Sequence, residues 1–340
     1  MQDPFSKDRI LKTDRKRVYD AYSGWPALAR EGFRVDVKVP RPAPRKAYFL
    51  GMGGSAAGGD IVASWLTGRR GVEIAVFKGQ MPIGDMSDAL AVACSVSGQT
   101  EETIKMMQTA VARGATVISM STGGRLAQVS DKLGVPRVAV PKVLAPRFSL
   151  PFIVFAALSI LDRTFGLRCG SEADETFRQM DALADKVSGE TPVDANPSKA
   201  LALRLMGVTP VIYGSRVTRG AGIRFKNVLN ENAKKHALFD GIPDAFHNDV
   251  ESWADPTTGF IPIFLRHSAE EAGDRSKTDA LLKLLTKAGK GPVEVRGSGR
   301  SSLSQILSMV YELDMVSYYI AIGLGRDPFP VALIDSLKSA

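Results

Sequence analysis

The sequence predicts an α/β protein with two tandem, doubly wound subdomains, each with a mainly parallel sheet flanked by helices. Three observations lead to this fold class. From residue 47 onward, apolar runs of strand length alternate with segments of helix length, which is typical of parallel sheets with crossover helices. The order of strand, Gly/Ser loop and helix then recurs in the second half. At 340 residues, the chain also exceeds the length of one average domain.

The first half supplies five expected strands, which are short, apolar and mostly followed by a glycine or a polar turn. They cover residues 46–52, 72–77, 89–94, 116–121 and 137–141. Helix-length segments at 56–66 and 101–114 lie between strands. Together with a helical segment at the N-terminus, these elements predict a first unit over residues 1–165.

The second half repeats the pattern of the first. Residues 209–226 (TPVIYGSRVTRGAGIRFK) have the same order of apolar strand, Gly/Ser loop and helix as residues 46–63. The other expected elements are a connecting helix and linker at 174–200, strands at 260–266 and 292–296, and a long closing helix at 303–325. We therefore expect a second unit over residues 166–340, which includes the connecting helix and the C-terminal tail.

Composition limits the setting in which the protein works. Hydrophobic residues make up 44% and charged residues 24%, as in ordinary globular proteins. The N-terminus is charged and has no signal-peptide stretch, and no segment offers about 18 consecutive apolar residues. Two cysteines, Cys94 and Cys169, are too few for a disulfide framework or a thiolate metal site. We expect a cytoplasmic protein that does not cross a membrane.

The chain is basic, with a net charge of +8 and a pI near 9.4. Such a charge suits nucleic acid, but it also steers small anions toward a protein. The densest basic run, residues 12–17 (KTDRKR), precedes aromatic residues at roughly helical spacing, and no zinc-finger, RRM or KH signature accompanies it. We interpret the run as the solvated face of a helix and expect no nucleic-acid partner.

A glycine-rich loop follows the first expected strand. Residues 51–56 (GMGGSA) satisfy the G-x-G-x-x-G/A pattern of a dinucleotide-binding loop. That kind of site also needs an acidic residue at the end of the second strand, to hold the ribose 2′-OH. Here the second strand ends at Lys78, which could tolerate a 2′-phosphate. A nicotinamide-dependent oxidoreductase therefore remains an alternative.

A second polar loop favours a smaller phosphate. The segment SVSGQT at 95–100 places three hydroxyl groups at the end of the third strand, just before a helix. Helix N-termini attract anions, and hydroxyl donors at two adjacent strand ends suit one phosphate monoester above the sheet. N-capping by Ser97 or Thr100 is the plainer interpretation. The predicted phosphate-binding residues are Gly53, Gly54, Ser55, Ser95, Ser97 and Thr100.

The two loops, GMGGSAAGGD at 51–60 and SVSGQTEET at 95–103, resemble those of the sugar isomerase (SIS) domain. From SGWP at Trp25 to IDSLK near the C-terminus, the whole chain is similar to bifunctional phosphoglucose/phosphomannose isomerases. The resemblance implies two SIS subdomains, a homodimer with its active site at the subunit interface, and no metal or nucleotide cofactor. It also implies a phosphorylated hexose as substrate, with glucose 6-phosphate and mannose 6-phosphate converted to and from fructose 6-phosphate through an enediolate.

An aldose–ketose isomerase needs a carboxylate base near C1 and C2 and a positive group for the developing oxyanion. The resemblance assigns the base to Glu231, in NENAK. A surface pair of Glu231 with Lys234 or Lys235 is the plainer interpretation from spacing alone. The resemblance also implies that Arg147, in LAPRFSLP, stabilises the enediolate.

Two further residues take roles from the resemblance. His247, in AFHNDVESW, is implied to open the sugar ring, and an imidazole can carry a proton at neutral pH. Lys338, in IDSLK, is implied to fold back to the sugar, although a lysine so near the terminus can also be frayed. His236 and His267 are expected to be structural or exposed.

The chain departs from its relatives at two positions. Phe329, in DPFP, replaces a common threonine, which puts the acceptance of mannose 6-phosphate in question. Val96 replaces the usual aromatic residue of the serine loop and is expected to alter only packing. A non-catalytic sugar-phosphate sensor and an isomerase of another phosphosugar, such as an amino sugar, stay open as alternatives. The presence of both Glu231 and His247 favours an enzyme.

Overall fold

The computed structural model of the protein describes residues 3–39, 44–67, 69, 71–81, 84–255 and 259–339, without the side chains of residues 338 and 339. Its residues fall into two compact units. We call Gly24–Phe177 the first-sheet unit, and Met1–Ser23 together with Arg178–Ala340 the second-sheet unit.

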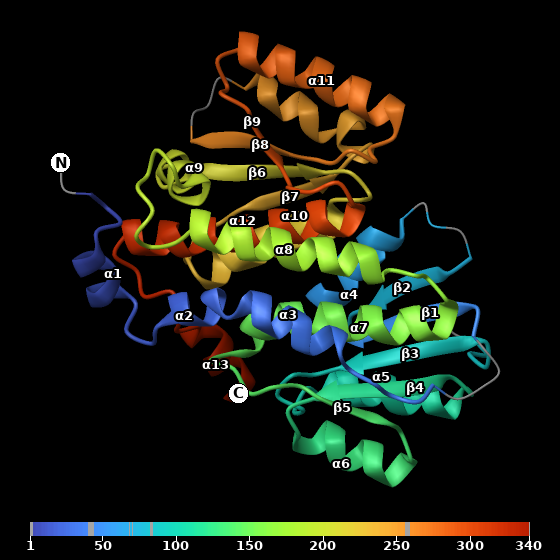
Figure 1. Ribbon diagram of the computed structural model, residues 1–340. Coiled ribbons are helices and arrows are strands. Elements are labelled where there is room, and N and C mark those ends of the chain that lie inside the picture. Colours follow the sequence, from blue (N-terminus) through green and yellow to red (C-terminus); the bar gives the residue numbers. More distant parts are fainter. Residues whose placement is uncertain are drawn as a thin grey trace. The chain divides into compact units, whose positions relative to one another are not determined.

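A five-stranded parallel sheet forms the centre of the first-sheet unit, in the order β2-β1-β3-β4-β5 (Figure 1). Its strands are β1 (Lys46–Gly51), β2 (Glu73–Phe77), β3 (Ala89–Cys94), β4 (Thr116–Ser121) and β5 (Arg137–Ala139). Its helices are α3 (Trp25–Phe33), α4 (Gly53–Leu66), α5 (Glu101–Ala112), α6 (Gly124–Leu133), the 3-10 helix η1 (Pro146–Ser149) and α7 (Leu150–Phe165). Every residue of the central strand β3 is buried, as expected for a parallel sheet covered on both faces. The predicted α/β class is confirmed.

A four-stranded parallel sheet forms the centre of the second-sheet unit, in the order β7-β6-β8-β9. Its strands are β6 (Thr209–Gly214), β7 (Leu238–Gly241), β8 (Phe260–Arg266) and β9 (Val293–Arg296). Its helices are α1 (Lys7–Thr13), α2 (Val18–Ser23), α9 (Pro197–Leu205), α10 (Arg219–Glu231), η2 (Asp244–His247), η3 (Asp249–Ala254), α11 (Ala272–Lys287), α12 (Ser302–Gly323) and α13 (Ala332–Ser339). The sequence analysis did not predict β7, because this short edge strand (LFDG) begins with an exposed leucine and contains an aspartate.

The end of the first-sheet unit lies later in the chain than the expected boundary at 165/166. Helix α8 (Gly170–Lys186) begins in this unit and ends in the other. Its first turns pack on the first-sheet unit through Phe177, whose ring centroid lies 4.8 Å from that of Phe155. Glu172 on the same helix accepts a hydrogen bond from Trp65 Nε1 at 3.0 Å. These contacts place the start of the connecting helix with the first sheet.

The N-terminal segment belongs to the second-sheet unit, whereas the sequence analysis grouped it with the first half. Arg9 on α1 donates from Nε to the carbonyl oxygen of Ile322 at 3.0 Å. Asp14 accepts a hydrogen bond from Tyr318 Oη at 3.1 Å. Arg9 and Asp14 thus hold the N-terminal segment against α12, although most of the chain lies between the two in sequence.

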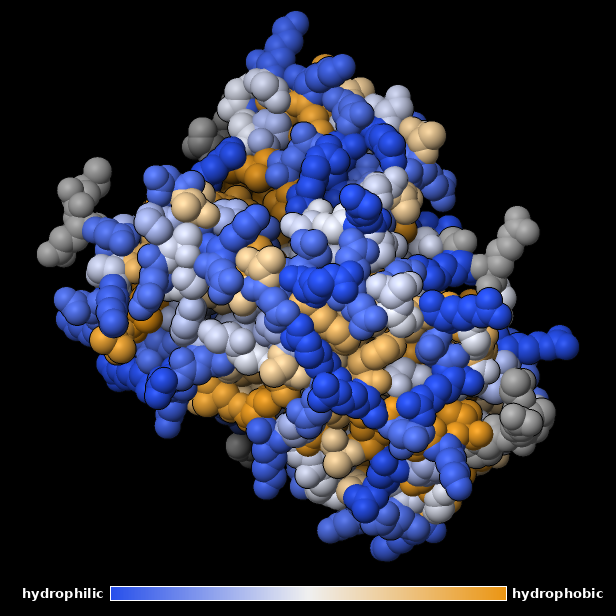
Figure 2. Space-filling model, in the orientation of Figure 1, coloured by the Kyte–Doolittle hydropathy of each residue, from blue (hydrophilic) through white to orange (hydrophobic). Residues whose placement is uncertain are grey.

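Two helical segments, Pro146–Phe165 and Ser302–Gly323, are long and apolar enough to cross a membrane. They lie inside the protein, since 78% and 89% of their most apolar windows are buried. The first, which contains α7, packs on α3 and α4, and the second, α12, packs on α9 and α10. The face drawn in Figure 2 is largely hydrophilic, with smaller hydrophobic patches between the polar side chains. These helices are the core helices of the two units.

Glu312 on α12 is a partly buried carboxyl group. Burial raises the pKa of Glu312 from 4.5 to about 7, against the opposing effect of Lys186. Between the two pKa values the folded chain holds a proton that the unfolded chain has lost, so stability falls as the pH rises from the unfolded to the folded pKa and then levels off. We expect Glu312→Gln to raise the free energy of unfolding near pH 8 by about 3 kcal/mol and to leave it almost unchanged near pH 4.

Urea unfolding at both pH values measures this effect. Glu190→Gln, at an exposed glutamate of the same unit, is the matched control and should change neither value. A Glu312→Gln variant with the same pH dependence as the wild type would contradict the prediction.

Candidate active site

The glycine-rich loop forms the first turn of α4. Gly53, Gly54 and Ser55 are the first three residues of this helix, after Met52. Gly53 has a φ of 49°, in the left-handed region that favours glycine. The N–H of Ser55 donates to the carbonyl oxygen of Met52 at 3.0 Å, so this turn presents the N–H groups of Gly53 and Gly54 as donors at the carboxyl end of β1.

The serine loop is a tight turn between β3 and α5. Ser95 Oγ donates to Thr100 Oγ1 at 2.9 Å, and Ser97 Oγ accepts from the backbone N–H of Gln99 at 3.3 Å. Thr100 is the N-cap residue of α5, but its side chain makes no capping hydrogen bond. Ser95 is buried, Thr100 half-buried and Ser97 exposed. Side-chain capping by Thr100 therefore does not account for this group of hydroxyls.

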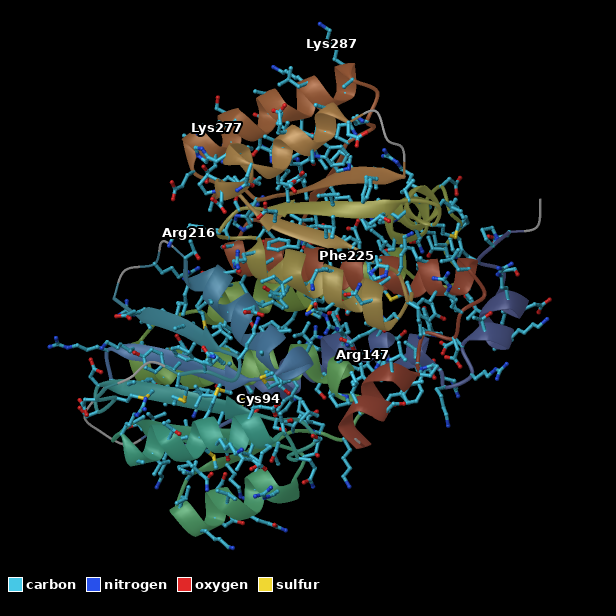
Figure 3. The ribbon with its side chains drawn as sticks, turned by 180° about the vertical axis from the view of Figure 1, so that it is seen from behind. Cys94, Arg147, Arg216, Phe225, Lys277 and Lys287 are labelled. Carbon is cyan, nitrogen blue, oxygen red and sulfur yellow. The ribbon has the colours of Figure 1, made fainter. Side chains whose placement is uncertain are left out.

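The two loops meet where the sheet changes its winding direction, between β1 and β3. Gly51 and Cys94, the last residues of the two strands, are paired across the sheet. Ser55 Oγ accepts a hydrogen bond from the backbone N–H of Val96 at 3.3 Å, which joins the loops directly. Burial raises the pKa of the Cys94 thiol beneath them to about 12, so it stays protonated at neutral pH (Figure 3). The predicted adjacency of the two loops is confirmed.

Arg147 lies beside the first of these loops. It belongs to η1, is only 5% exposed, and its guanidinium carbon lies 4.7 Å from the centroid of the Phe148 ring. A Cβ atom added to Gly54 would lie 3.4 Å from the Cα atom of Arg147, so the two backbones approach closely. The fold thus brings a buried cation to the first turn of α4.

Lys78, which kept the dinucleotide alternative open, has an acidic partner. Its Nζ atom lies 2.8 Å from Oδ2 of Asp60 on α4. The ammonium group is therefore paired with a carboxylate, where a 2′-phosphate would require it to be available.

Glu231 is the last residue of α10 and is half-buried. Helix α10 follows β6 and runs back across the sheet, so it ends at the amino edge. Lys235 confirms this position, because its Nζ atom donates to the carbonyl oxygen of Met206, just before β6, at 3.3 Å. Lys234 Nζ donates to the carbonyl oxygen of Asp327 at 2.5 Å. Lys234 and Lys235, three and four residues after Glu231, thus both donate to backbone carbonyl oxygens.

His247 is exposed and ends η2, in the segment after β7. A buried tyrosine that the sequence analysis did not identify holds this segment to the sheet. Tyr213, near the carboxyl end of β6, donates its hydroxyl proton to Asp249, and its oxygen accepts from Trp253 Nε1 at 2.6 Å. Burial raises the pKa of Tyr213, so the hydroxyl remains a donor. His247 therefore lies at the carboxyl edge.

Glu231 and His247 of one chain consequently lie at opposite edges of the second sheet. The strand between these edges, β6, has six residues. At about 3.3 Å per residue, the edges are roughly 20 Å apart.

The remaining residues singled out in the sequence are Lys338, His236 and His267. Lys338 is in α13, and its side chain lies outside the described residues. His236 is exposed, as expected. His267 is buried, where its Nδ1 atom accepts from the N–H of Ala269 at 2.9 Å and burial lowers its pKa. These contacts agree with a structural role for His267.

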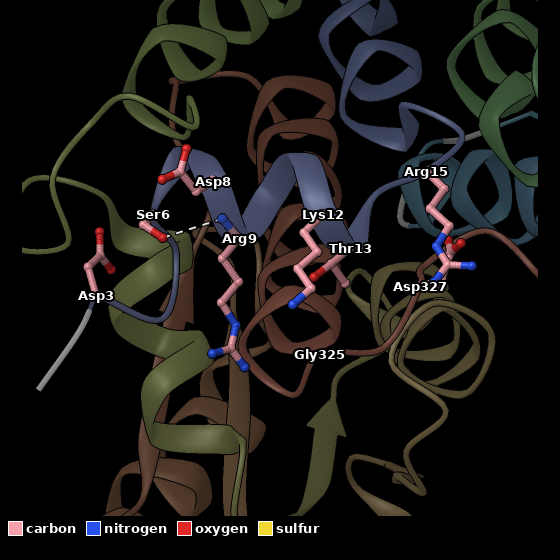
Figure 4. A pocket seen from close by; sticks show the side chains of 9 residues that line it. All are labelled: Asp3, Ser6, Asp8, Arg9, Lys12, Thr13, Arg15, Gly325 and Asp327. Atoms are coloured by element: carbon pink, nitrogen blue, oxygen red, sulfur yellow. Dashed lines mark hydrogen bonds between the residues drawn. The ribbon is translucent and has the colours of Figure 1, made fainter.

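A surface pocket of about 580 Å³ lies elsewhere, against the N-terminal segment (Figure 4). It is lined by residues between Asp3 and Arg15 together with Gly325 and Asp327. Its charged side chains are three bases and three acids, and none of the predicted site residues lines it. Among the described residues, no group of three or more His, Cys, Asp or Glu side chains is arranged to hold a metal ion.

Comparison with known proteins decides the family. Residues 194–340 match the bacterial phospho-glucose isomerase C-terminal SIS domain. A bifunctional phosphoglucose/phosphomannose isomerase of Caldicellulosiruptor bescii is 30% identical over 315 residues, which cover 91% of this chain and 93% of the relative. The chain belongs to the bifunctional phosphoglucose/phosphomannose isomerase family. The predicted resemblance is thereby confirmed.

Other known proteins are also similar to the chain. A D-glucosamine-6-phosphate 4-epimerase of Sulfolobus acidocaldarius is 29% identical over 248 residues, which cover 72% of this chain and 76% of the relative. The crystal structure of a hypothetical protein from Thermus thermophilus superposes with a TM-score of 0.74 at 15% identity, and covers 98% of this chain and 94% of that one. The second similarity supports the fold.

Proposed function

We propose that the protein interconverts glucose 6-phosphate, and mannose 6-phosphate, with fructose 6-phosphate. The observation that carries this proposal is the direct joining of the glycine-rich loop and the serine loop above the switch point of the first sheet, in a chain of this isomerase family. Helix N-termini and hydroxyl groups there suit the 6-phosphate. We place the phosphate on Gly53, Gly54, Ser55, Ser95, Ser97 and Thr100.

The proposed chemistry is a proton transfer between C1 and C2 of the open-chain sugar. Glu231 removes the proton from one carbon and returns it to the other, so that the substrate passes through an enediolate. Arg147 stabilises the oxygen on which negative charge develops, with Lys338 as a second cation. His247 moves a proton between the ring oxygen and the anomeric hydroxyl to open the ring.

We propose that the working form is a homodimer in the cytoplasm. The separation of Glu231 and His247 supports this proposal, because the two residues can serve one sugar only if they come from different chains. The exposure of His247 agrees with a role on a second copy.

The range of substrates depends on the segment that contains Phe329. Lys234 Nζ donates to the carbonyl oxygen of Asp327, and Arg326 donates to that of Ala233 at 2.8 Å. These hydrogen bonds hold the segment that contains Phe329 against residues 233 and 234, just after Glu231. The size of the Phe329 side chain would then determine which C2 epimer of the substrate fits. The similarity to a D-glucosamine-6-phosphate 4-epimerase makes epimerisation of an amino-sugar phosphate the second candidate.

The test is turnover of purified protein with EDTA present. Fructose 6-phosphate is supplied, and glucose 6-phosphate and mannose 6-phosphate are measured separately. A parallel reaction contains D-glucosamine 6-phosphate. We expect both hexose products and no reaction of the amino sugar.

Each other result has a defined meaning. Glucose 6-phosphate alone would retain the isomerase and show that Phe329 excludes the other epimer. Reaction of D-glucosamine 6-phosphate alone would replace the proposal by the second candidate. Binding of fructose 6-phosphate without any turnover would indicate a sensor.

A further inference from the structure

A buried polar cluster lies under the C-terminal end of α10, beside Glu231. We call it the Tyr22 network, and its members are Tyr22, Arg224, Asn232, Asp314 and Ser317. At most 1% of the surface of each of these residues is exposed. Polar groups in a core cost free energy unless they are fully paired, and apolar residues of similar size often stabilise a protein equally well. Stability alone therefore does not account for this network.

Asn232 connects the network to Glu231 along the backbone. It is the C-cap residue of α10, and its N–H donates to the carbonyl oxygen of Val228 at 2.8 Å. Its side-chain amide donates to Tyr22 Oη at 2.6 Å and to Ser317 Oγ at 2.9 Å. Both amide protons of the residue directly after Glu231 are thus fixed by buried partners.

A buried ion pair forms the other half of the network. Arg224 Nε and Nη2 lie 3.1 and 2.6 Å from the two carboxylate oxygens of Asp314. Burial raises the pKa of Asp314, whereas Arg224 and a hydrogen bond from Tyr22 oppose that shift. The charge of Glu231 acts on both members of the pair. The carboxylate of Glu231 is therefore near a fixed cation and a fixed anion.

Tyr22 joins the two halves, and the N-terminal segment supplies it. Its hydroxyl accepts from Asn232 and donates to Asp314. Its carbonyl oxygen accepts from Tyr311 Oη on α12 at 3.0 Å. Asp14, one helix earlier, accepts from the N–H of Val18 at 2.7 Å and so holds the start of α2. The helical segment before the first sheet thereby reaches the end of α10.

We propose that the Tyr22 network positions Glu231 for proton transfer, and that the N-terminal segment completes it. This inference rests on the proposed function. When a catalytic base is misplaced by about 1 Å, the rate can fall up to a hundredfold. The Tyr22 hydroxyl, which fixes the residue directly after Glu231, therefore matters for turnover. The phosphate loops belong to the other unit, so substrate affinity should depend little on Tyr22.

The test compares Tyr22→Phe with Tyr319→Phe in the full chain. Tyr319 is also buried on the second-sheet unit, and its hydroxyl donates to the carbonyl oxygen of Val187 at 2.6 Å. Each variant loses one buried hydroxyl, and urea midpoints verify that the losses of stability match. We expect Tyr22→Phe to lower kcat for fructose 6-phosphate about tenfold with KM within about twofold. Tyr319→Phe should retain kcat within about twofold of the wild type.

Ser317→Ala provides a second, milder variant, since it removes one of the two acceptors of Asn232. It should lower kcat about threefold, again without a change of KM. Equal kcat values for Tyr22→Phe and Tyr319→Phe, with an active wild type, would overturn this inference and leave the proposed function standing. A wild type without isomerase activity would overturn both.

Discussion

Glu231→Gln should lower kcat for the conversion of fructose 6-phosphate to glucose 6-phosphate by about 10³-fold, because an amide cannot accept the proton. The substitution keeps the size of the side chain, and the contacts of Asn232 that fix the end of α10 remain. The KM should therefore stay within about twofold of the wild-type value. Single-turnover and steady-state measurements, with circular dichroism to verify folding, test this prediction.

Glu190→Gln is the matched control, because Glu190 is an exposed glutamate of the same unit, and it should retain full activity. A folded Glu231→Gln protein with more than about a tenth of the wild-type kcat would exclude Glu231 as the base.

The positions of Glu231 and His247 extend this prediction to mixed dimers. His247→Ala should also be inactive on the ring form of the substrate. In a dimer with one chain of each variant, one of the two sites combines an intact Glu231 with an intact His247 from the other chain. Refolding the two inactive variants together should therefore restore about a quarter of the wild-type activity, since about half of the dimers are mixed. No recovery would place both residues on one chain.

Local patterns in the sequence predicted most strands of the first sheet and the two loops that follow β1 and β3. The strands of the first sheet are short, mainly apolar runs, and the proposed phosphate loops are short glycine and hydroxyl motifs directly after two of them. Their adjacency also followed from the sequence, since parallel strands end at the same edge. β7 was not predicted, because LFDG has neither the length nor the apolar character of a buried strand.

Partner choice over long sequence distances could not be predicted in this way. Tyr213 lies within an apolar run, where its hydroxyl group gives no sign that Asp249 will accept from it. Tyr22 and Asn232 are far apart in the chain, and only the packing of α2 against the end of α10 joins them. The same holds for Arg147, whose approach to Gly54 depends on the return of the chain after β5. These contacts are properties of the folded unit and not of any local pattern.

Gly98→Ala should destabilise the first-sheet unit strongly and disturb phosphate binding. Gly98 has a φ of 67°, where an alanine costs about 1 to 2 kcal/mol. A Cβ atom there would also lie 1.9 Å from the carbonyl oxygen of Gly123, a backbone atom that cannot swing away. Such crowding adds about 1 to 3 kcal/mol, so we expect a total loss of about 3 kcal/mol in the free energy of unfolding.

Gly134→Ala separates the two causes. Gly134 caps α6 with a φ of 66°, and a Cβ atom there would meet nothing within 4 Å. Gly134→Ala should therefore show the conformational cost alone, about 1 kcal/mol, with unchanged kinetics.

The folded fraction of the Gly98→Ala protein should bind fructose 6-phosphate about tenfold more weakly, because the serine loop must move away from Gly123 to admit the methyl group. Urea unfolding and KM values for the two variants measure both effects. Equal losses of stability would show that the close approach of the two loops does not constrain Gly98, and an unchanged KM would separate the serine loop from the phosphate site.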